Sequence, residues 1–175
     1  MSIGIRDAVQ QTKHRLEESP DAARSADRPA IAVLDGGLRC RVEAPDGSVL
    51  ITDMPASLGG GGSAPTAGWL ARAARASCLA TRIAMHAAEC GVELETVEVV
   101  AESESDTRGL LGLDETVPPG PLRSALRVRI VAPDVDDEKL RELVEWAEAH
   151  SPVSDLVTRA VPSEVTIERE VGALR

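Results

Sequence analysis

Aromatic residues are almost absent from this sequence, which contains no Phe, no Tyr and only two Trp residues, Trp69 and Trp146. A hydrophobic core must therefore be built mainly from Val, Leu, Ile and Ala. Proteins that bind single-stranded nucleic acid without sequence preference stack the bases on aromatic side chains. The sequence offers no such platform, which argues against this class of function.

Long apolar segments are also missing. No run approaches the roughly 20 apolar residues that a membrane-spanning helix needs, and residues 1–18 lack the apolar core of a secretory signal. The formal net charge is −10 and the sequence pI is about 4.8, so the average field repels phosphate backbones and anionic membrane surfaces. We therefore expect a soluble, cytoplasmic protein with no nucleic-acid or membrane partner.

Cysteine is scarce, and Cys40, Cys78 and Cys90 are widely spaced without forming a CxxC pair. An odd and scattered set of cysteines indicates free thiols in a reducing compartment. The histidines are equally far apart, and no carboxylate accompanies them at metal-ligand spacing. We therefore expect no disulfide, no metal site and no bound cofactor.

The length of 175 residues suits one domain with a single hydrophobic core and a terminal extension. Residues 3–18 carry an apolar stripe at helical spacing, and the polar residues 20–28 have the composition of a linker. The expected division is a helix and linker over 1–28 and a main domain over 29–175. The extension should contribute little to the core. The sequence leaves open whether its helix packs on the same domain or on a partner subunit.

Alternating apolar residues separated by turn residues predict a strand over 30–34 and a β-hairpin over 38–53. After a glycine-rich loop, residues 66–89 are expected to form a long helix, with Thr66 as its N-cap and Gly91 as its C-terminal stop. Small residues recur along this helix and permit close approach of a neighbour. We therefore expect the helix to be central and buried.

The second half of the chain mixes strands and helices. The predicted elements are a strand over 92–104 with a wet acidic face, a strand over 122–131, a helix over 135–149 capped by Asp134, a short helix over 153–160 and a closing strand over 165–171. Because strands and helices do not alternate strictly, the pattern favours an α+β fold.

Cys78 stands in the middle of the predicted long helix with a cation on each side. Arg75 lies at i−3 and Arg82 at i+4, so the three side chains share one helix face. Nearby cations favour the thiolate, which is the nucleophilic form of cysteine. Cys78 is therefore the candidate nucleophile, and Arg75 and Arg82 are candidate thiolate stabilisers. The alternative is that Cys78 is a small buried core residue, the commonest fate of a free cysteine.

Three segments carry a resemblance to a known family: TDMPASLGGGGSAPTAGWLARAARASCLATRIAMHAAECGVELETVEV, then SDTRGLLGLD, then HSPVSDLV. A glycine loop, a small-residue helix with a central cysteine and a following strand resemble the OsmC/Ohr superfamily over residues 30–171. The resemblance implies an OsmC-like α+β fold, in which an antiparallel sheet wraps around long central helices of an intertwined homodimer. It also implies active sites where the two chains meet.

The resemblance further implies a chemistry. Active members of the superfamily reduce organic hydroperoxides with a cysteine that becomes a sulfenic acid, and a second cysteine then closes a disulfide that dithiol cofactors reduce. Cys78 matches the first cysteine, whereas Ser151 stands where the second is expected. A hydroxyl cannot form a disulfide, so the resolving position is lost and an external thiol reductant must take its place. Ser151 followed by Pro152 is also an ordinary helix start.

Two further positions depart from the superfamily pattern. Active relatives usually carry Glu near the start of the cysteine helix, where this chain has Ala67–Gly68–Trp69. That Glu holds a catalytic Arg, for which Arg39 and Arg41 are the candidates, although alternating charges on a hairpin are more often a solvated face. Cys90 is a poor substitute resolver, because twelve residues of helix place it about 18 Å from Cys78.

Two hypotheses of different class follow. The first is a homodimeric hydroperoxide reductase with peroxiredoxin-like activity, which acts in oxidative stress through the Cys78 thiol. The second is a non-catalytic OsmC-like module that binds an apolar small molecule at the dimer cleft. The retained Cys78 favours the first and the missing Glu favours the second. A third possibility, a partner-binding domain that uses the 3–18 helix, is also open.

Overall fold

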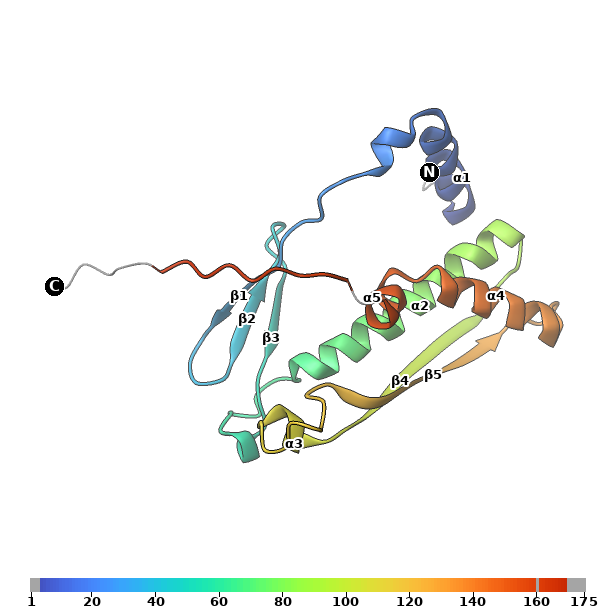
Figure 1. The fold of residues 1–175 in the computed structure, drawn as a ribbon. Helices are drawn as coiled ribbons and strands as arrows, with labels where there is room; N and C mark the ends of the chain where they lie inside the picture. Colours follow the sequence, from blue (N-terminus) through green and yellow to red (C-terminus); the bar gives the residue numbers. More distant parts are fainter. Residues whose placement is uncertain (1–3, 160, 170–175) are drawn as a thin grey trace.

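Helices and antiparallel strands are mixed along the chain in the computed structural model, which describes residues 4–159 and 161–169 (Figure 1). The elements are α1 (Ile5–Glu18), the 3₁₀ turn η1 (Pro20–Ala23), β1 (Ile31–Leu34), β2 (Cys40–Glu43), β3 (Val49–Thr52), the 3₁₀ turn η2 (Ala56–Leu58), α2 (Ala67–Cys90), β4 (Thr96–Ser105), α3 (Thr107–Leu110), β5 (Pro121–Val131), α4 (Asp137–Ala149) and α5 (Pro152–Thr158). The α+β class expected from the sequence is confirmed.

The helix predicted over 66–89 is observed as α2, with the expected caps at both ends. The Thr66 side chain accepts a hydrogen bond from the backbone N–H of Trp69, which satisfies one of the free donors of the first turn. At the other end Gly91 adopts a left-handed φ of 71°, and its N–H reaches the last carbonyls of the helix. A side chain at that φ would strain the backbone, so glycine ends α2 there.

The hydrophobic core lies where α2 meets α4 and the β4–β5 sheet. Its fully buried side chains are Leu79, Ile83 and Ala87 from α2 and Leu143 and Ala147 from α4. An alanine on each helix permits close approach of the two backbones, and apolar residues of β4 and β5 cover the other side of α2. The described residues of this core include no aromatic ring, in keeping with a chain that has only two Trp residues.

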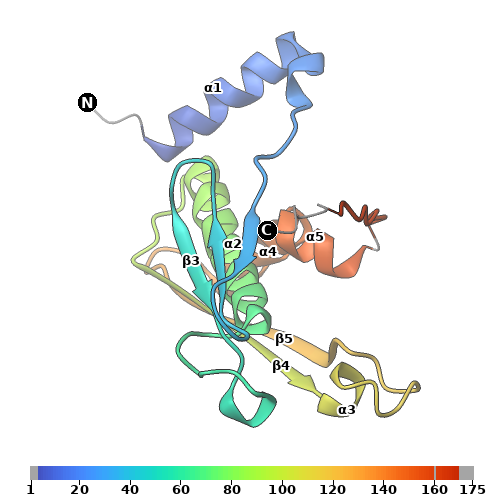
Figure 2. The same ribbon diagram turned by 90° about the vertical axis from the view of Figure 1, so that its left-hand side faces the viewer.

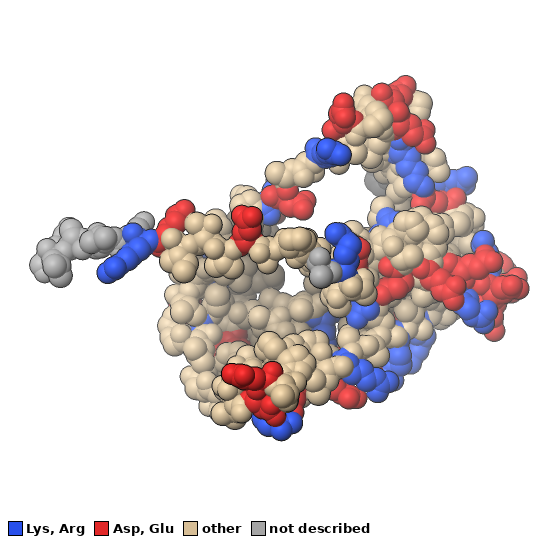
Figure 3. All heavy atoms as spheres, in the orientation of Figure 1, with Lys and Arg blue, Asp and Glu red and all other residues tan. Residues whose placement is uncertain are grey.

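The strands β4 and β5 form a two-stranded antiparallel sheet with one wet face. Three ion pairs cross that face, Glu98–Arg129, Glu102–Arg127 and Glu104–Arg123, at N···O distances of 3.0, 2.6 and 3.6 Å. Acidic side chains gather instead at the start of α4, at the right edge of Figure 3. The strand begins at Thr96 rather than at residue 92, because the Val92 N–H bonds the Ala87 carbonyl at the end of α2.

A second sheet, of strand order β1–β2–β3, lies beside the β4–β5 unit without pairing to it (Figures 1 and 2). Its apolar side chains have little cover: Ile31 is 56% exposed, Val33 60% and Leu50 56%. Apolar surface of this extent on a sheet normally marks a contact with another molecule or segment.

The closing strand predicted over 165–171 is wrong for residues 165–169, and residues 170 and 171 lie outside the described residues. Val165 and Ile167 are each 89% exposed, and no strand pairs with this segment among the described residues. Alternation gives a segment the potential to form a strand, but the strand needs an edge to pair with. The start of α4 is also corrected, since Asp136 rather than Asp134 caps it by accepting from the Lys139 N–H.

The N-terminal helix α1 lies over the C-terminal half of α2 (Figures 1 and 2). None of its described residues is buried, and Lys13 forms an ion pair with Glu89 of α2. The division at residue 28 stays a prediction. Among the described residues, no helix is long and apolar enough to cross a membrane.

Candidate functional site around Cys78

Cys78 lies half-buried in the middle of α2 and faces the first residue of the α5 segment. The Ser151 hydroxyl donates a hydrogen bond to the Cys78 sulfur at an O···S distance of 3.3 Å. Ser151 is only 1% exposed, so its hydroxyl is shielded from water, whereas Cys78 remains partly exposed. The structure thus brings together the two positions that the sequence motifs singled out, although they are 73 residues apart.

Ser151 has a structural role at the same time. Its oxygen accepts a hydrogen bond of 3.3 Å from the Ser154 N–H, and Pro152 occupies the first helical position of α5. The predicted helix start is therefore confirmed. Because the oxygen accepts from Ser154, its own hydrogen is available to the Cys78 sulfur.

Arg75 points to α4 and β5, where it is held from two sides. One guanidinium nitrogen lies 3.2 Å from a carboxylate oxygen of Glu148, and the other donates to the Ser124 hydroxyl at 2.8 Å. The second Glu148 oxygen accepts a 2.9 Å hydrogen bond from the Ser154 hydroxyl. Glu148 therefore ties Arg75 to the same turn of α5 that holds the Ser151 hydroxyl.

Arg82 occupies a different environment on the other side of Cys78. Its guanidinium carbon lies 5.1 Å from the centre of the Trp146 ring, a cation–π geometry. Its Nη1 lies 3.6 Å from the Met85 sulfur, on the following turn of α2. The buried Nε atoms of Arg82 and Arg75 both lack a hydrogen-bond partner among the described residues. Among the described residues no carboxylate forms an ion pair with Arg82.

Trp146 is the centre of a stack of three rings. His86 of α2 lies on one side at 3.7 Å between ring centres, and His150 lies on the other at 3.9 Å, with interplanar angles of 16° and 14°. Burial lowers the pKa of His86 below its ordinary value of 6.5, although the Glu89 carboxylate acts in the opposite direction. The stack joins α2 to the end of α4, directly before Ser151.

The stability of the fold should fall in acid, because His86 in the stack between α2 and α4 has a lowered pKa. A base whose pKa is lowered in the folded state binds fewer protons than it does in the unfolded chain, so stability falls as pH drops through the window just below 6.5. We expect the Tm to decrease between about pH 7 and pH 5, and His86→Gln to flatten that decrease. His14→Gln, at an exposed site of α1, is the matched control. Equal slopes for wild type and His86→Gln would contradict this prediction.

A cavity of about 520 Å³ lies along the first half of α2 and ends near Arg75. Its wall is mainly apolar and includes Met54, Leu58, Ala71, Leu110, Pro119 and Val157. Arg72 also borders the cavity and donates to the Ser103 hydroxyl at 3.1 Å. Cys78 is not among the residues that line this cavity and lies one helical turn beyond Arg75 on α2.

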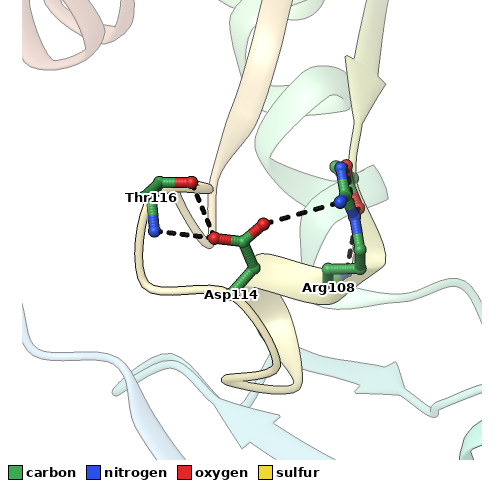
Figure 4. A network of polar contacts seen from close by, with 4 residues as sticks. Arg108, Asp114 and Thr116 are labelled. Carbon is green, nitrogen blue, oxygen red and sulfur yellow. Dashed lines mark hydrogen bonds and ion pairs between the residues drawn. The ribbon is translucent and has the colours of Figure 1, made fainter.

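A polar network fixes the loop on the outer wall of this cavity (Figure 4). Arg108 forms ion pairs with Asp106 and Asp114, and Asp114 also accepts a 2.6 Å hydrogen bond from the Thr116 hydroxyl. Hydrogen bonds from Arg108 hold the pKa of Asp106 below its ordinary value. Hydrogen bonds from Thr116 likewise lower the pKa of Asp114, so both carboxylates stay charged at neutral pH and keep their contacts within the loop.

The glycine-rich loop before α2 is organised by Asp53, whose side chain is 3% exposed. Its carboxylate accepts hydrogen bonds from the N–H groups of Met54, Gly61 and Ser63 and from the Ser63 hydroxyl, at 2.8 to 3.3 Å. The Ser63 donors lower the pKa of Asp53. At Gly60 a Cβ atom would meet the Met54 carbonyl oxygen at 1.9 Å, so only glycine fits this approach.

The remaining sequence candidates do not join the site. Arg39 pairs with Asp35 and Arg41 with Glu43, all at exposed or half-buried positions, which fits the solvated face considered above. Cys40 lies on β2, and Cys90 is exposed at the end of α2, where its sulfur is 3.7 Å from a His86 nitrogen. No cluster able to hold a metal is present in the described part of the chain.

The family model described as OsmC-like protein matches residues 60–166. The chain belongs to the OsmC-like family. The match includes Cys78, both flanking arginines and the Ser151 turn, so it covers the whole polar network around the thiol. Membership of the OsmC/Ohr superfamily, expected from the sequence motifs, is thereby confirmed.

Solved structures of OsmC-like proteins share the fold. An organic hydroperoxide resistance protein OsmC of Legionella pneumophila is 24% identical with a TM-score of 0.57, and the match covers 77% of this chain and 93% of that one. OhrB of Bacillus subtilis is 21% identical with a TM-score of 0.52, covering 77% and 92%. An OsmC-like protein of Vibrio cholerae is 13% identical with a TM-score of 0.63, covering 77% and 95%. No curated protein matches the chain in sequence.

Sequence reasoning missed three residues of this site, Glu148, Trp146 and Asp53. Glu148 stands three positions before Ser151, but its spacing to Arg75 of 73 residues gives no local signal. Trp146 is one of two aromatic residues of its kind in the chain, and this scarcity was the one available hint. Asp53 lies just before the glycine-rich loop, where a carboxylate commonly accepts loop N–H groups.

Proposed function

We propose that this OsmC-like protein reduces organic hydroperoxides in a peroxide-stress response, with Cys78 as the nucleophile. The main support is the hydrogen bond from the buried Ser151 hydroxyl to the half-buried Cys78 sulfur, since such a donor stabilises a thiolate. The family match and the names of the Legionella and Bacillus relatives, as organic hydroperoxide resistance proteins, support the substrate class.

The proposed reaction begins when the Cys78 thiolate attacks the terminal oxygen of the hydroperoxide. An S–O bond forms while the O–O bond breaks, and the alcohol leaves after it takes up a proton. Cys78 becomes a sulfenic acid. A first external thiol then condenses with it to give a mixed disulfide and water, and a second thiol restores Cys78 and releases the external disulfide.

Arg75 and Arg82 are proposed to assist by favouring the thiolate. The usual Glu of the superfamily is missing, but Glu148 holds Arg75 from α4 at 3.2 Å. The Arg–carboxylate pair near the thiol is therefore supplied by a different element. Ser151 replaces the resolving cysteine, so the proposal requires a thiol from outside the chain.

The test is peroxide consumption by the purified protein with cumene hydroperoxide and an excess of a dithiol. Alcohol should form in step with oxidised dithiol, and without the dithiol one sulfenic acid per chain should appear at Cys78 by peptide mass. If peroxide persists and Cys78 stays reduced while Cys40 or Cys90 oxidises, the enzymatic proposal is wrong.

The cavity of about 520 Å³ favours a second candidate, the binding of an apolar small molecule without catalysis. Its apolar wall and its size suit a medium-sized organic ligand. Equilibrium binding of an unreactive apolar alcohol, with no peroxide consumption in the assay above, would replace the first proposal with this one.

We further expect a homodimer, because the apolar side chains of the β1–β2–β3 sheet and the segment 165–169 are exposed in one chain. Light scattering at micromolar concentration should give twice the chain mass of 18.4 kDa. Val33→Glu places a charge on that sheet and should shift the protein towards the monomer. A stable species of 18.4 kDa for the wild type would contradict the expectation.

A further inference from the structure

The cavity of about 520 Å³ beside the first half of α2 has a mainly apolar wall, yet two arginines, Arg72 and Arg75, belong to that wall. The turn η2 and the helix α3 both lie at this end of α2 (Figure 1). A cation next to apolar surface is costly unless a partner of opposite charge compensates it. The partners of the charged groups on the wall therefore indicate what the cavity can bind.

Two of the three charged side chains on this wall have partners within the chain. Arg75 lies 3.2 Å from the Glu148 carboxylate. Asp106 forms an ion pair with Arg108, whose hydrogen bonds lower the pKa of that carboxyl group. Because each pair is close to neutral as a whole, neither adds much to the field inside the cavity.

Arg72 is the third charged side chain, and it lacks such a partner. Its Nη1 donates to the Ser103 hydroxyl at 3.1 Å, and Ser103 is itself part of the wall. Glu102 and Glu104 lie near Arg72 along β4, but both form ion pairs with arginines of β5. No carboxylate of the described residues forms an ion pair with Arg72. A guanidinium has five N–H donors, so Arg72 retains donors for an anion in the cavity.

The start of α2 adds to this positive field. Thr66, Ala67 and Gly68, the N-cap and the first two residues of the helix, line the cavity, and the first turn contains no acidic residue. The N-terminal end of a helix carries a partial positive charge. An apolar cavity with one unpaired cation and a helix start on its wall suits an amphipathic ligand with a single negative charge.

We propose that this cavity binds an aliphatic monocarboxylate, with the carboxylate at Arg72 and Ser103 and the alkyl chain against the apolar wall. A carboxylate can accept two parallel N–H bonds from one guanidinium. The Ser103 oxygen accepts from Arg72, so its own hydrogen is available to the ligand. The inference rests on the apolar binding site proposed above and not on the reactivity of Cys78, which does not line the cavity.

The experiment is calorimetric titration of the full chain with decanoate and with decanol near neutral pH, below the concentration at which decanoate forms micelles. The two ligands share one alkyl chain and differ in charge, because a carboxylic acid is ionised at this pH. Decanoate should bind roughly tenfold to 100-fold more tightly, the range expected for one hydrogen-bonded contact with a charged group. Added salt should reduce this difference, because it screens partly exposed charges.

Variants locate the carboxylate. Arg72→Gln should lower the affinity for decanoate to about that for decanol and leave decanol binding unchanged, whereas Arg72→Lys keeps the charge and should recover part of the difference. The matched control is Arg129→Gln, which removes a charge from the exposed face of β5 and should change neither affinity. Ala71→Leu adds bulk to the cavity wall and should weaken the binding of both ligands.

The inference is overturned if the wild type binds decanol as tightly as decanoate, if it binds neither ligand, or if Arg72→Gln behaves like Arg129→Gln. If Arg72→Gln does not fold, the difference between the two ligands in the wild type and in Arg72→Lys still decides. A protein that prefers decanoate but consumes no peroxide keeps this inference and loses only the enzymatic proposal. Equal binding of both ligands leaves an apolar site without the carboxylate contact.

Discussion

Replacing Cys78 with serine should abolish peroxide consumption. A serine oxygen is a far weaker nucleophile than a thiolate, and the side-chain hydrogen bonds of the described residues give residue 78 only Ser151 as a partner, which is no base. We expect the dithiol-dependent rate to fall by at least about 100-fold, well within the loss found when an enzyme loses its nucleophile. The fold should survive, because the sulfur and a hydroxyl differ little in size and Cys78 is only half-buried.

The control for this prediction uses the two remaining cysteines. Cys40→Ser and Cys90→Ser should both keep the wild-type rate, because neither sulfur contacts the Ser151–Cys78 pair. Matching Tm values for the three variants would show that the comparison is fair. If Cys78→Ser still consumes peroxide and Cys40→Ser does not, the nucleophile is Cys40 on β2, which contradicts the assignment.

Local sequence patterns predicted the helix that carries Cys78, the proposed nucleophile. Thr66 predicted the N-cap and Gly91 the C-terminal stop of α2, and the two bounds were correct to within one residue. Placing Cys78 on a central helix, with two arginines on its face, follows from the same local periodicity. Ser151–Pro152 likewise predicted the start of α5.

Contacts between residues far apart in the sequence could not be predicted from local sequence patterns. The partner of Arg75 depends on how α4 docks against α2, and the sequence around Glu148 does not reveal which residue of α2 it will face. The segment 165–169 illustrates the reverse case, because its alternation is genuine but a strand exists only when another edge accepts it. The exposed sheet β1–β2–β3 has the same origin. Its apolar face is encoded locally, but the described residues leave Ile31, Val33 and Leu50 more than half exposed.

Replacing Ser151 with cysteine should restore an internal resolving step. The Ser151 oxygen is already 3.3 Å from the Cys78 sulfur, so a thiol there needs a shift of only about an ångström to reach the disulfide bond length of roughly 2 Å. After attack on the hydroperoxide, the new thiol should condense with the Cys78 sulfenic acid, forming a disulfide and releasing water. Sulfinic acid at Cys78 should then appear later and at higher peroxide.

The matched control is Ser154→Cys, which makes the same change one turn further along α5. Ser154 is also buried, but its hydroxyl contacts Glu148 and not Cys78, so this variant should form no disulfide with Cys78. Ser151→Cys should also lower stability by about 1 kcal/mol, because sulfur is a weaker acceptor for the Ser154 N–H. After a peroxide titration, peptide mass should be used to compare the disulfide and the sulfinic acid at Cys78 in both variants and in the wild type. If Ser151→Cys over-oxidises as fast as wild type with no disulfide, the thiol at residue 78 is not the site of peroxide attack or the turn at residue 151 cannot reach it.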